Sequence, residues 1–360
     1  MTNVARAELL GSLLKSVSRS FYLTLRILPG PMRDPIGLAY LLARAADTIA
    51  DTPLIDPPRR LTLLLALRAA VGGDTSDATN QAMREVAGEV AGRQALPDEK
   101  RLLESLVSAL ALLDDLDAGD RAAVRDIVTT LTTGMEFDLR TFPAEDSGRI
   151  AALHDVSELD RYTWLVAGCV GEFWTKMTCA HLPGTFDEPE ATLVARGIRF
   201  GKALQLTNIL RDCAKDLRIG RCYLPTSMLE RHGLTPPALL GPDASVRARP
   251  VLVELIGTAL AHYRAALDYT LAIPRLSLRL RLACLWPILI GLETLQLLAS
   301  NDAWLDPARI SKVSRNDVYR LVAGSTAVVC FDSVLRRWIE RLMRDVQTRL
   351  AQTGAAHAVA

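Results

Sequence analysis

The sequence has almost no net charge, because 42 basic residues stand against 41 acidic ones and leave a formal charge of +1. Such a balance provides no broad attraction toward nucleic acid, and no nucleic-acid partner is expected. The six cysteines include no Cys-x-x-Cys pair, and the five histidines include neither an HExxH motif nor a pair at ligand spacing. A zinc site is therefore not expected, and reduced thiols in a cytoplasmic protein are predicted.

Long hydrophobic segments and strand patterns are also missing. The N-terminal segment lacks the apolar core of a signal peptide. The most apolar late stretch, 283–299, is interrupted by Glu293, so it predicts a buried core helix rather than a membrane span. We find no alternating pattern typical of half-buried strands and no GxGxxG motif after a strand, which argues against a Rossmann domain.

The sequence does contain a helical pattern along nearly its whole length. Apolar residues make up 49% of the chain and recur at three- and four-residue spacing, which allows a sizeable core. The segments with this pattern are 35–50, 100–116, 119–140, 155–180, 188–218, 247–273, 278–299 and 315–350. No composition shift or fixed repeat divides the chain. We predict an all-α fold, with a single domain over residues 1–350 and a disordered tail over residues 351–360.

The first candidate site is a pair of aspartates, Asp47 and Asp51, in the segment ARAADTIADT. Their four-residue spacing places both on one face of a helix, with about 6 Å between the Cβ atoms. Two like charges in this arrangement repel each other, and Mg²⁺, which prefers carboxylate and phosphate oxygens, removes that penalty. The apolar residues before them suggest a lined cavity. The alternative is a pair of surface acids near a helix end.

The second candidate site lies in the segment LQLTNILRDCAKD. Asn208, Asp212 and Asp216 step by four along one helical face, and Gln205 lies one turn earlier on nearly the same stripe. Arg211 neighbours the acids and can pair with them or with phosphate oxygens. A solvated charged face would carry more charges and fewer amides, so this pattern also favours a binding site.

Taken together, the two aspartate motifs indicate a site for diphosphates. If the two helices face each other across a cavity, they form two negative walls that hold Mg²⁺ and, through it, diphosphate groups. Diphosphate leaves readily once its charge is neutralised, so an allylic diphosphate could ionise there. The carbocation needs a dry apolar cavity because water would quench it, and a helical bundle supplies one.

At this point the sequence resembles the squalene/phytoene synthase family over roughly residues 12–345. The resemblance implies a bundle of the class I isoprenoid synthase type with a central apolar cavity, and a prenyltransferase activity. It rests on segments that occur in the family's order, namely SVSRSFYLTLRILP (16–29), LAYLLARAADTIAD (38–51), TTGMEFDL (132–139), RYTWLVAGCVGEF (161–173) and LQLTNILRDCAKD (204–216).

The resemblance also implies roles for individual residues. The catalytic residues would be Tyr162, beside the reacting carbons, and the four aspartates, which with Asn208 would bind Mg²⁺. The substrate-binding residues would be Ser18, Ser20, Phe21, Tyr40, Arg44, Gln205, Asn208 and Arg211. The two serines can alternatively be a helix cap or turn, and Phe21 and Tyr40 can be ordinary core aromatics.

Two late segments are similar to bacterial squalene synthases, RLRLACLWPILIGLETLQLL (279–298) and ISKVSRNDVYRL (310–321). By that resemblance Lys312 and Arg315 would contact the phosphate of NADPH, and the alternative is a basic cap before a surface helix. GMEFDL, in contrast, is similar to phytoene synthases. The activity implied is that of a squalene synthase, which condenses two farnesyl diphosphates through presqualene diphosphate to squalene with Mg²⁺ and NADPH.

Other activities stay open at this level. One alternative is a phytoene or dehydrosqualene synthase, and another is a presqualene diphosphate synthase that works without NADPH. A hypothesis of another class is a catalytically inactive helical lipid-binding or assembly factor, which should have lost one or more of the four aspartates. We expect a cytoplasmic location, with membrane attachment that is peripheral and at the inner face.

Overall fold

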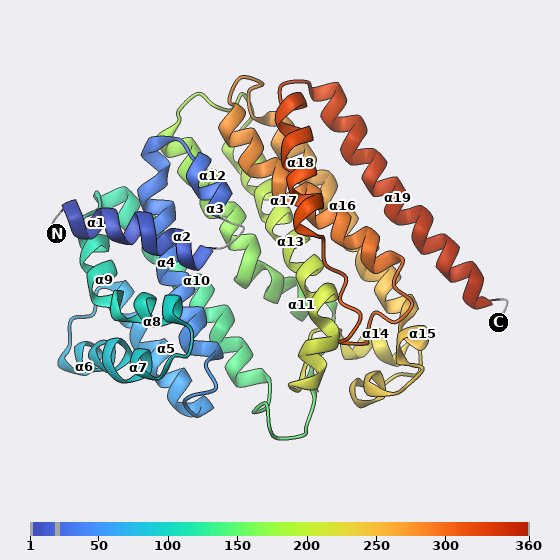
Figure 1. Cartoon of the computed structure of the whole chain (residues 1–360), viewed down its shortest axis with the longest axis horizontal. Coiled ribbons are helices and arrows are strands. Elements are labelled where there is room, and N and C mark those ends of the chain that lie inside the picture. The colour runs from blue at the N-terminus through green and yellow to red at the C-terminus, as the bar shows by residue number, and fades with distance from the viewer. Residues whose placement is uncertain (1–2, 19–21, 359–360) are drawn as a thin grey trace. The chain divides into compact units, whose positions relative to one another are not determined.

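Helices make up nearly all regular structure in the computed structural model, which describes residues 3–18 and 22–358 (Figure 1). The strands among these residues are β1 (Ala151–Ala152) and β2 (Arg221–Cys222), which pair in parallel. The all-α prediction is therefore confirmed. Helix α19 (Asp332–Ala358) continues past residue 350, so the chain remains helical where the disordered tail was predicted to begin.

The described residues fall into two compact units. Unit 1 comprises the residues up to Arg140 together with Lys176–Pro183, and unit 2 comprises Thr141–Thr175 and the residues from Gly184 onward. The first aspartate pair therefore belongs to unit 1 and the second to unit 2. The prediction of a single domain over residues 1–350 stays a prediction.

The longest helix that lies wholly within unit 1 is α4 (Gly30–Asp51), which packs against α5, α8 and α9. Pro31 lies in its first turn, where the missing N–H leaves no helical hydrogen bond unmade. Its buried face includes Leu38, Leu42 and Ile49, at the spacing of a single helical stripe. The other elements of this part of the chain are α1 (Asn3–Ala7), η1 (Glu8–Leu13), α2 (Leu14–Ser18), α3 (Tyr22–Ile27), α5 (Pro57–Gly72), α6 (Asp77–Glu85), η3 (Val86–Val90), α7 (Ala91–Arg93), α8 (Pro97–Glu104), α9 (Leu106–Asp115) and α10 (Ala118–Thr141).

Unit 2 is built on three long helices, α13 (Glu190–Arg218), α16 (Arg249–Ala272) and α17 (Leu278–Ala299), which pack against one another. Helix α17 also packs against α18 (Arg315–Val328) and α19 (Figure 1). The remaining elements are α11 (Val156–Thr163), η4 (Trp164–Gly168), α14 (Thr226–Glu230), η5 (Pro236–Leu240) and α15 (Ala244–Arg247). Helix α12 (Cys169–His181) belongs to unit 2 up to Thr175 and to unit 1 from Lys176.

Helix α17 is long and apolar enough to cross a membrane by length and composition alone. In the structure, however, 72% of its apolar window is buried inside the protein. Leu285, Leu289 and Leu292 have no exposed surface, and they face the neighbouring helices of unit 2. This burial supports the prediction of a core helix at 283–299.

The crossing of α13 with η4 and α12 requires glycine. A Cβ atom at Gly171 would lie 1.8 Å from the carbonyl oxygen of Gly197, and one at Gly201 would lie 2.1 Å from the carbonyl oxygen of Ala167. Both obstacles are backbone atoms of the facing helix, so a side-chain rotation cannot relieve them. The helix backbones therefore touch at these positions.

Replacing Gly171 with alanine is expected to lower the free energy of unfolding by about 1–3 kcal/mol, because the helices must separate to admit the methyl group. Gly257 is a matched control, since a Cβ atom there meets no heavy atom within 4 Å. Gly257→Ala, in α16, is expected to raise the free energy of unfolding by about 0.5–1 kcal/mol. Urea denaturation followed by circular dichroism measures both, and a stabilising Gly171→Ala would contradict the backbone contact.

Candidate active site

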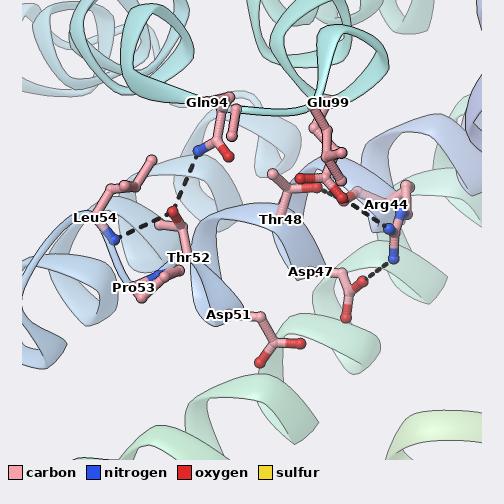
Figure 2. Close-up of a pocket in the computed structure, with 11 residues that line it drawn as sticks. Arg44, Asp47, Thr48, Asp51, Thr52, Pro53, Leu54, Gln94 and Glu99 are labelled. Carbon is pink, nitrogen blue, oxygen red and sulfur yellow. Dashed lines mark hydrogen bonds and ion pairs between the residues drawn. The ribbon is translucent and has the colours of Figure 1, made fainter.

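The first aspartate pair lies on the last two turns of α4, beside a cavity of about 340 Å³ within unit 1 (Figure 2). Figure 2 shows the carboxylates of Asp47 and Asp51 pointing to the same side of the helix. The polar lining of the cavity consists mainly of Arg44, Asp47, Thr48, Asp51, Gln94 and Glu99. The structure therefore brings the predicted residues Arg44, Asp47 and Asp51 together at one cavity.

Arg44 lies between two carboxylates of this cavity. Its guanidinium donates one hydrogen bond to Asp47 and another, 3.3 Å long, to Glu99. Burial and the nearby charge of Asp51 nevertheless raise the pKa of Asp47 to about 6, against the opposing effect of Arg44. The protein thus neutralises the carboxylates incompletely, and a bound cation would relieve the remaining repulsion.

Two polar residues of this cavity, Gln94 and Glu99, were not predicted from the sequence. The amide of Gln94 donates a hydrogen bond of 3.3 Å to the hydroxyl of Thr52, which also accepts one of 3.4 Å from the backbone N–H of Leu54. These bonds fix the chain where it leaves α4, next to Asp51. Gln94 and Glu99 come from a distant part of the chain and carry no motif spacing, so the fold alone reveals them.

The N-terminal substrate-binding candidates are placed in part. Ser20 and Phe21 lie outside the described residues. Ser18 is buried in α2, and its hydroxyl donates a hydrogen bond to the carbonyl oxygen of Leu14 within the same helix. This bond satisfies Ser18 internally and differs from both the cap and the turn considered from the sequence. Tyr40 is half-buried in α4, two turns before Asp47.

A second cavity of unit 1 brings α2 close to the first aspartate motif. It has a volume of about 130 Å³, and its lining includes Ser16 and Val17 from α2 together with Arg44 and Glu99. Arg44 and Glu99 therefore line both cavities. Among the described residues of the segment 16–29, Ser16 and Val17 line this cavity, and neither was predicted as a binding residue.

The second aspartate motif lies on α13 in unit 2. Gln205, Asn208, Asp212 and Asp216 are all half-buried on one stripe of the helix. The guanidinium of Arg211 donates two hydrogen bonds to the carboxylate of Asp212, at 2.9 and 2.5 Å. These bonds raise the pKa of Arg211. The side chain of Asp212 is still 40% exposed, so a ligand can reach it.

The buried Tyr263 lies next to the second aspartate motif and contacts α13. The hydroxyls of Thr207 on α13 and Tyr263 on α16 lie 2.9 Å apart. Thr207 precedes Arg211 by one helical turn. Burial raises the pKa of the Tyr263 hydroxyl, which keeps it protonated. A Cβ atom at Gly291 of α17 would lie 1.8 Å from this hydroxyl oxygen. Three helices therefore meet at one hydroxyl, which sequence reasoning missed because Tyr263 resembles any core aromatic.

Tyr162 lies buried at the end of α11, in an aromatic cluster of unit 2. Its ring stacks on Tyr223 with centroids 4.9 Å apart, and Tyr223 meets Phe142 edge-on, also at 4.9 Å. Tyr223 follows β2, which begins after Gly220, a residue with a φ of 83° at the end of α13. The cluster fixes the ring of Tyr162. Its position beside reacting carbons stays a prediction.

The predicted NADPH residues, Lys312 and Arg315, are both exposed near the start of α18. Ser314 is the N-cap of this helix and accepts a hydrogen bond of 3.2 Å from the backbone N–H of Asp317. This is the geometry of a basic segment before a capped surface helix. The structure therefore matches the alternative weighed for the two basic residues, and contact with NADPH stays a prediction.

The two aspartate motifs have suitable donors for Mg²⁺. Within the described part of the chain no three His, Cys, Asp or Glu residues form a metal site by themselves. Mg²⁺ does not require such a site, because it commonly takes one or two carboxylates and completes its shell with water and phosphate oxygens. Asp47 with Asp51, and Asp212 with Asp216 and Asn208, provide such oxygens. The crowded charge at Asp47 is a further indication of a cation.

Comparison with known proteins yields a clear match. A sequence profile of squalene/phytoene synthases matches residues 14–317. The presqualene diphosphate synthase of Rhodopseudomonas palustris is 30% identical over 70% of this chain and 74% of its own length. The bifunctional lycopene cyclase/phytoene synthase of Colletotrichum graminicola is 32% identical over 71% of this chain. This chain spans 41% of the length of that relative, and 49% of the related bifunctional protein of Pyrenophora tritici-repentis.

The fold has solved counterparts. The structure of TcSQS with the ligand E5700 matches with a TM-score of 0.70, covering 96% of this chain and 98% of that one at 20% identity. This likeness concerns the fold, and it confirms the predicted isoprenoid synthase architecture.

Proposed function

Because the chain belongs to the squalene/phytoene synthase family, whose members are typically metal-dependent prenyltransferases, we propose that it condenses two farnesyl diphosphates to squalene through presqualene diphosphate. The observation that carries this proposal is the pair of aspartate motifs. Each unit has two carboxylates four residues apart on one helical face, and in each an arginine is bonded to one of them. A protein that handles two diphosphates needs such a pair of sites.

The arginines prepare these sites for diphosphate. Arg44 and Arg211 each use part of their guanidinium on a carboxylate, Asp47 and Asp212 respectively. A guanidinium has five N–H donors, so others remain for the oxygens of a bound diphosphate. Their fixed positions lower the cost of ordering the leaving group.

Mg²⁺ bound by the four aspartates would neutralise the departing diphosphate, which is the chemistry that the metal supplies. The protein's own part is to hold that leaving group and to keep water from the allylic cation. Tyr162 and Tyr223, buried and stacked, offer an apolar aromatic surface that stabilises positive charge and excludes water.

A presqualene diphosphate synthase is the second candidate. It is favoured by the exposure of Lys312 and Arg315, which lie at a helix start rather than in an enclosed cofactor pocket. The similarity to the Rhodopseudomonas palustris protein supports it as well. The two candidates share the first condensation and differ in the reduction that follows, for which squalene formation requires NADPH.

A product assay separates the candidates. Purified protein is incubated with farnesyl diphosphate and Mg²⁺, with and without NADPH, and the products are extracted. Squalene that forms only with NADPH is the expected result. Presqualene diphosphate under both conditions would support the second candidate, and phytoene from geranylgeranyl diphosphate without any squalene would overturn both. No turnover of any prenyl diphosphate would favour the catalytically inactive lipid-binding or assembly factor.

The proposed NADPH contact has its own test. Lys312→Ala combined with Arg315→Ala is expected to raise the NADPH concentration needed for half-maximal squalene formation by at least about tenfold, through loss of charged hydrogen bonds. Formation of presqualene diphosphate should not change. Arg320→Ala, a 77% exposed arginine on the same helix, is the matched control. An unchanged NADPH response in the double variant would leave the two residues as a basic helix start.

A further inference from the structure

Two loops of unit 2 lie side by side at one end of its long helices. One joins α16 to α17, and the other joins α18 to α19 (Figure 1). Arg275 in the first loop donates a hydrogen bond of 2.8 Å to Asp332 at the second. The buried Arg281 donates one of 2.9 Å to the carbonyl oxygen of Val329 and pairs with Asp332 at 2.7 Å. We call residues 274–282 and 329–337 the tip.

The tip exposes large apolar side chains from both of its segments. Leu276 is 89% exposed, Phe331 is 56% exposed and Leu278 is 42% exposed. A single exposed leucine is ordinary on a protein surface. Three large apolar residues on two segments joined by hydrogen bonds are a local concentration, and such a concentration marks an interaction site.

The tip also concentrates positive charge. Its two segments contain five arginines and one aspartate, an excess of four positive charges, whereas the whole chain has a net charge of +1. Arg275 and Arg281 are paired with Asp332. The other arginines, Arg279, Arg336 and Arg337, are exposed. The apolar residues are therefore accompanied by cationic side chains.

Acidic groups outside the tip offset part of its positive charge. Arg336 lies 3.7 Å from Asp268 and 4.0 Å from Glu340, and both acids are about half exposed. The loop before α13 reaches α16 through Phe186, whose ring lies 5.8 Å from that of Tyr269. That loop carries the exposed acid Asp187 and the half-buried Glu188, which pairs with Arg196, and α13 begins at the exposed Glu190. Arg279 and Arg337, one on each segment of the tip, form no ion pair with an acid among the described residues, so their charges remain available to a ligand.

We propose that the tip docks on membranes that contain anionic phospholipids. Leu276, Leu278 and Phe331 enter the boundary between headgroups and acyl chains, and the arginines bind the lipid phosphates. Apolar side chains with a basic rim are the combination that gives interfacial binding, because each contribution alone is weak and reversible. The exposed side chains of Arg279 and Arg337 favour an anionic lipid surface over an uncharged partner. The tip would then be the site of the peripheral membrane attachment expected from the sequence. Membrane docking at the tip does not depend on the proposed reaction.

Vesicle flotation tests the proposal with the full chain. Wild-type protein is expected to float with vesicles of phosphatidylcholine and phosphatidylglycerol, and to float less with phosphatidylcholine alone or with salt well above about 0.15 M. Leu276→Ser with Phe331→Ser should weaken binding to the anionic vesicles by at least about tenfold, from the loss of apolar burial. Arg279→Gln with Arg337→Gln should weaken it by several-fold and reduce the salt dependence. Tyr319→Ser with Arg320→Gln, an exposed apolar and basic pair on α18, is the matched control and should bind as wild type.

Insertion itself is tested with Leu276→Trp. Vesicles that carry brominated acyl chains should quench the fluorescence of this variant more than that of wild type, in which Trp338, next to the tip, is half-buried. Tip variants that bind anionic vesicles as tightly as wild type would overturn the proposal. So would concentration-dependent self-association that the Leu276→Ser, Phe331→Ser variant abolishes, because the occupant of the tip would then be a second copy of the chain.

Discussion

Replacing Asp47 with asparagine is expected to lower the rate of diphosphate release by about 10²–10³-fold while the protein stays folded. The substitution keeps the size of the side chain and removes the charge that a divalent cation would bind. Burial and Asp51 raise the pKa of Asp47 to about 6, so the ionised form is disfavoured in the folded protein. A neutral asparagine relieves that repulsion. Turnover should therefore fall while Tm stays the same or rises, as expected where a site is optimised for function rather than stability.

Two controls distinguish this loss from unfolding. Asp126→Asn removes an exposed carboxylate from α10 of the same unit and should leave turnover unchanged. Mg²⁺ should raise Tm in wild-type protein, and it should raise Tm less in Asp47→Asn, because a ligand stabilises the fold it binds. Near-normal turnover in Asp47→Asn would remove Asp47 from the metal site. Loss of turnover together with loss of the helical circular dichroism signal would contradict the expected direction of the stability change.

The two aspartate motifs could be read from the sequence because each is local. Residues four apart on a helix share a face in any helical fold, so Asp47 with Asp51 and Asp212 with Asp216 needed no tertiary information. Glu99, in contrast, contacts Arg44 across 55 positions of the chain. Its segment has no unusual spacing, and the contact depends on how α8 packs against α4. The sequence therefore predicts the motifs and misses the residues that complete the cavity around them.

The same distinction holds for the fold. Apolar periodicity predicted the helices and the buried nature of α17, because each is a property of one segment. The contacts between helices were not predictable in this way. That Gly171 meets the backbone of Gly197, and that Tyr263 meets Gly291, follows from the depth at which two helices cross. Nothing in the sequence around these residues indicates that the members of each pair come into contact.

Replacing Arg281 is expected to lower the stability of the fold more than any other substitution considered for this protein. It is 1% exposed in α17, and its guanidinium donates hydrogen bonds to the carbonyl oxygens of Ile273 at 2.8 Å and Val329 at 2.9 Å. It also pairs with Asp332 at 2.7 Å. Arg281→Met keeps an apolar stem of similar reach and removes every one of these bonds. It should lower the free energy of unfolding by about 3–5 kcal/mol, since a buried network loses its donor.

Arg275 is the matched control, because it donates to the same carboxylate from a 68% exposed position. Arg275→Met should change the free energy of unfolding by less than about 1 kcal/mol, as is usual for an exposed ion pair. Burial opposes ionisation of Asp332, yet the hydrogen bonds from Arg281 and Arg275 outweigh it and hold the pKa of Asp332 below its usual value.

A carboxyl with a lowered folded-state pKa adds stability above its unfolded pKa and loses it as the pH falls through the folded value. Arg281→Met should therefore weaken the part of acid unfolding that Asp332 contributes, in addition to its effect at neutral pH. Urea denaturation at neutral and acidic pH measures both effects for the two variants. Equal losses for Arg281→Met and Arg275→Met would contradict the assignment, because burial of the arginine would then have no energetic consequence.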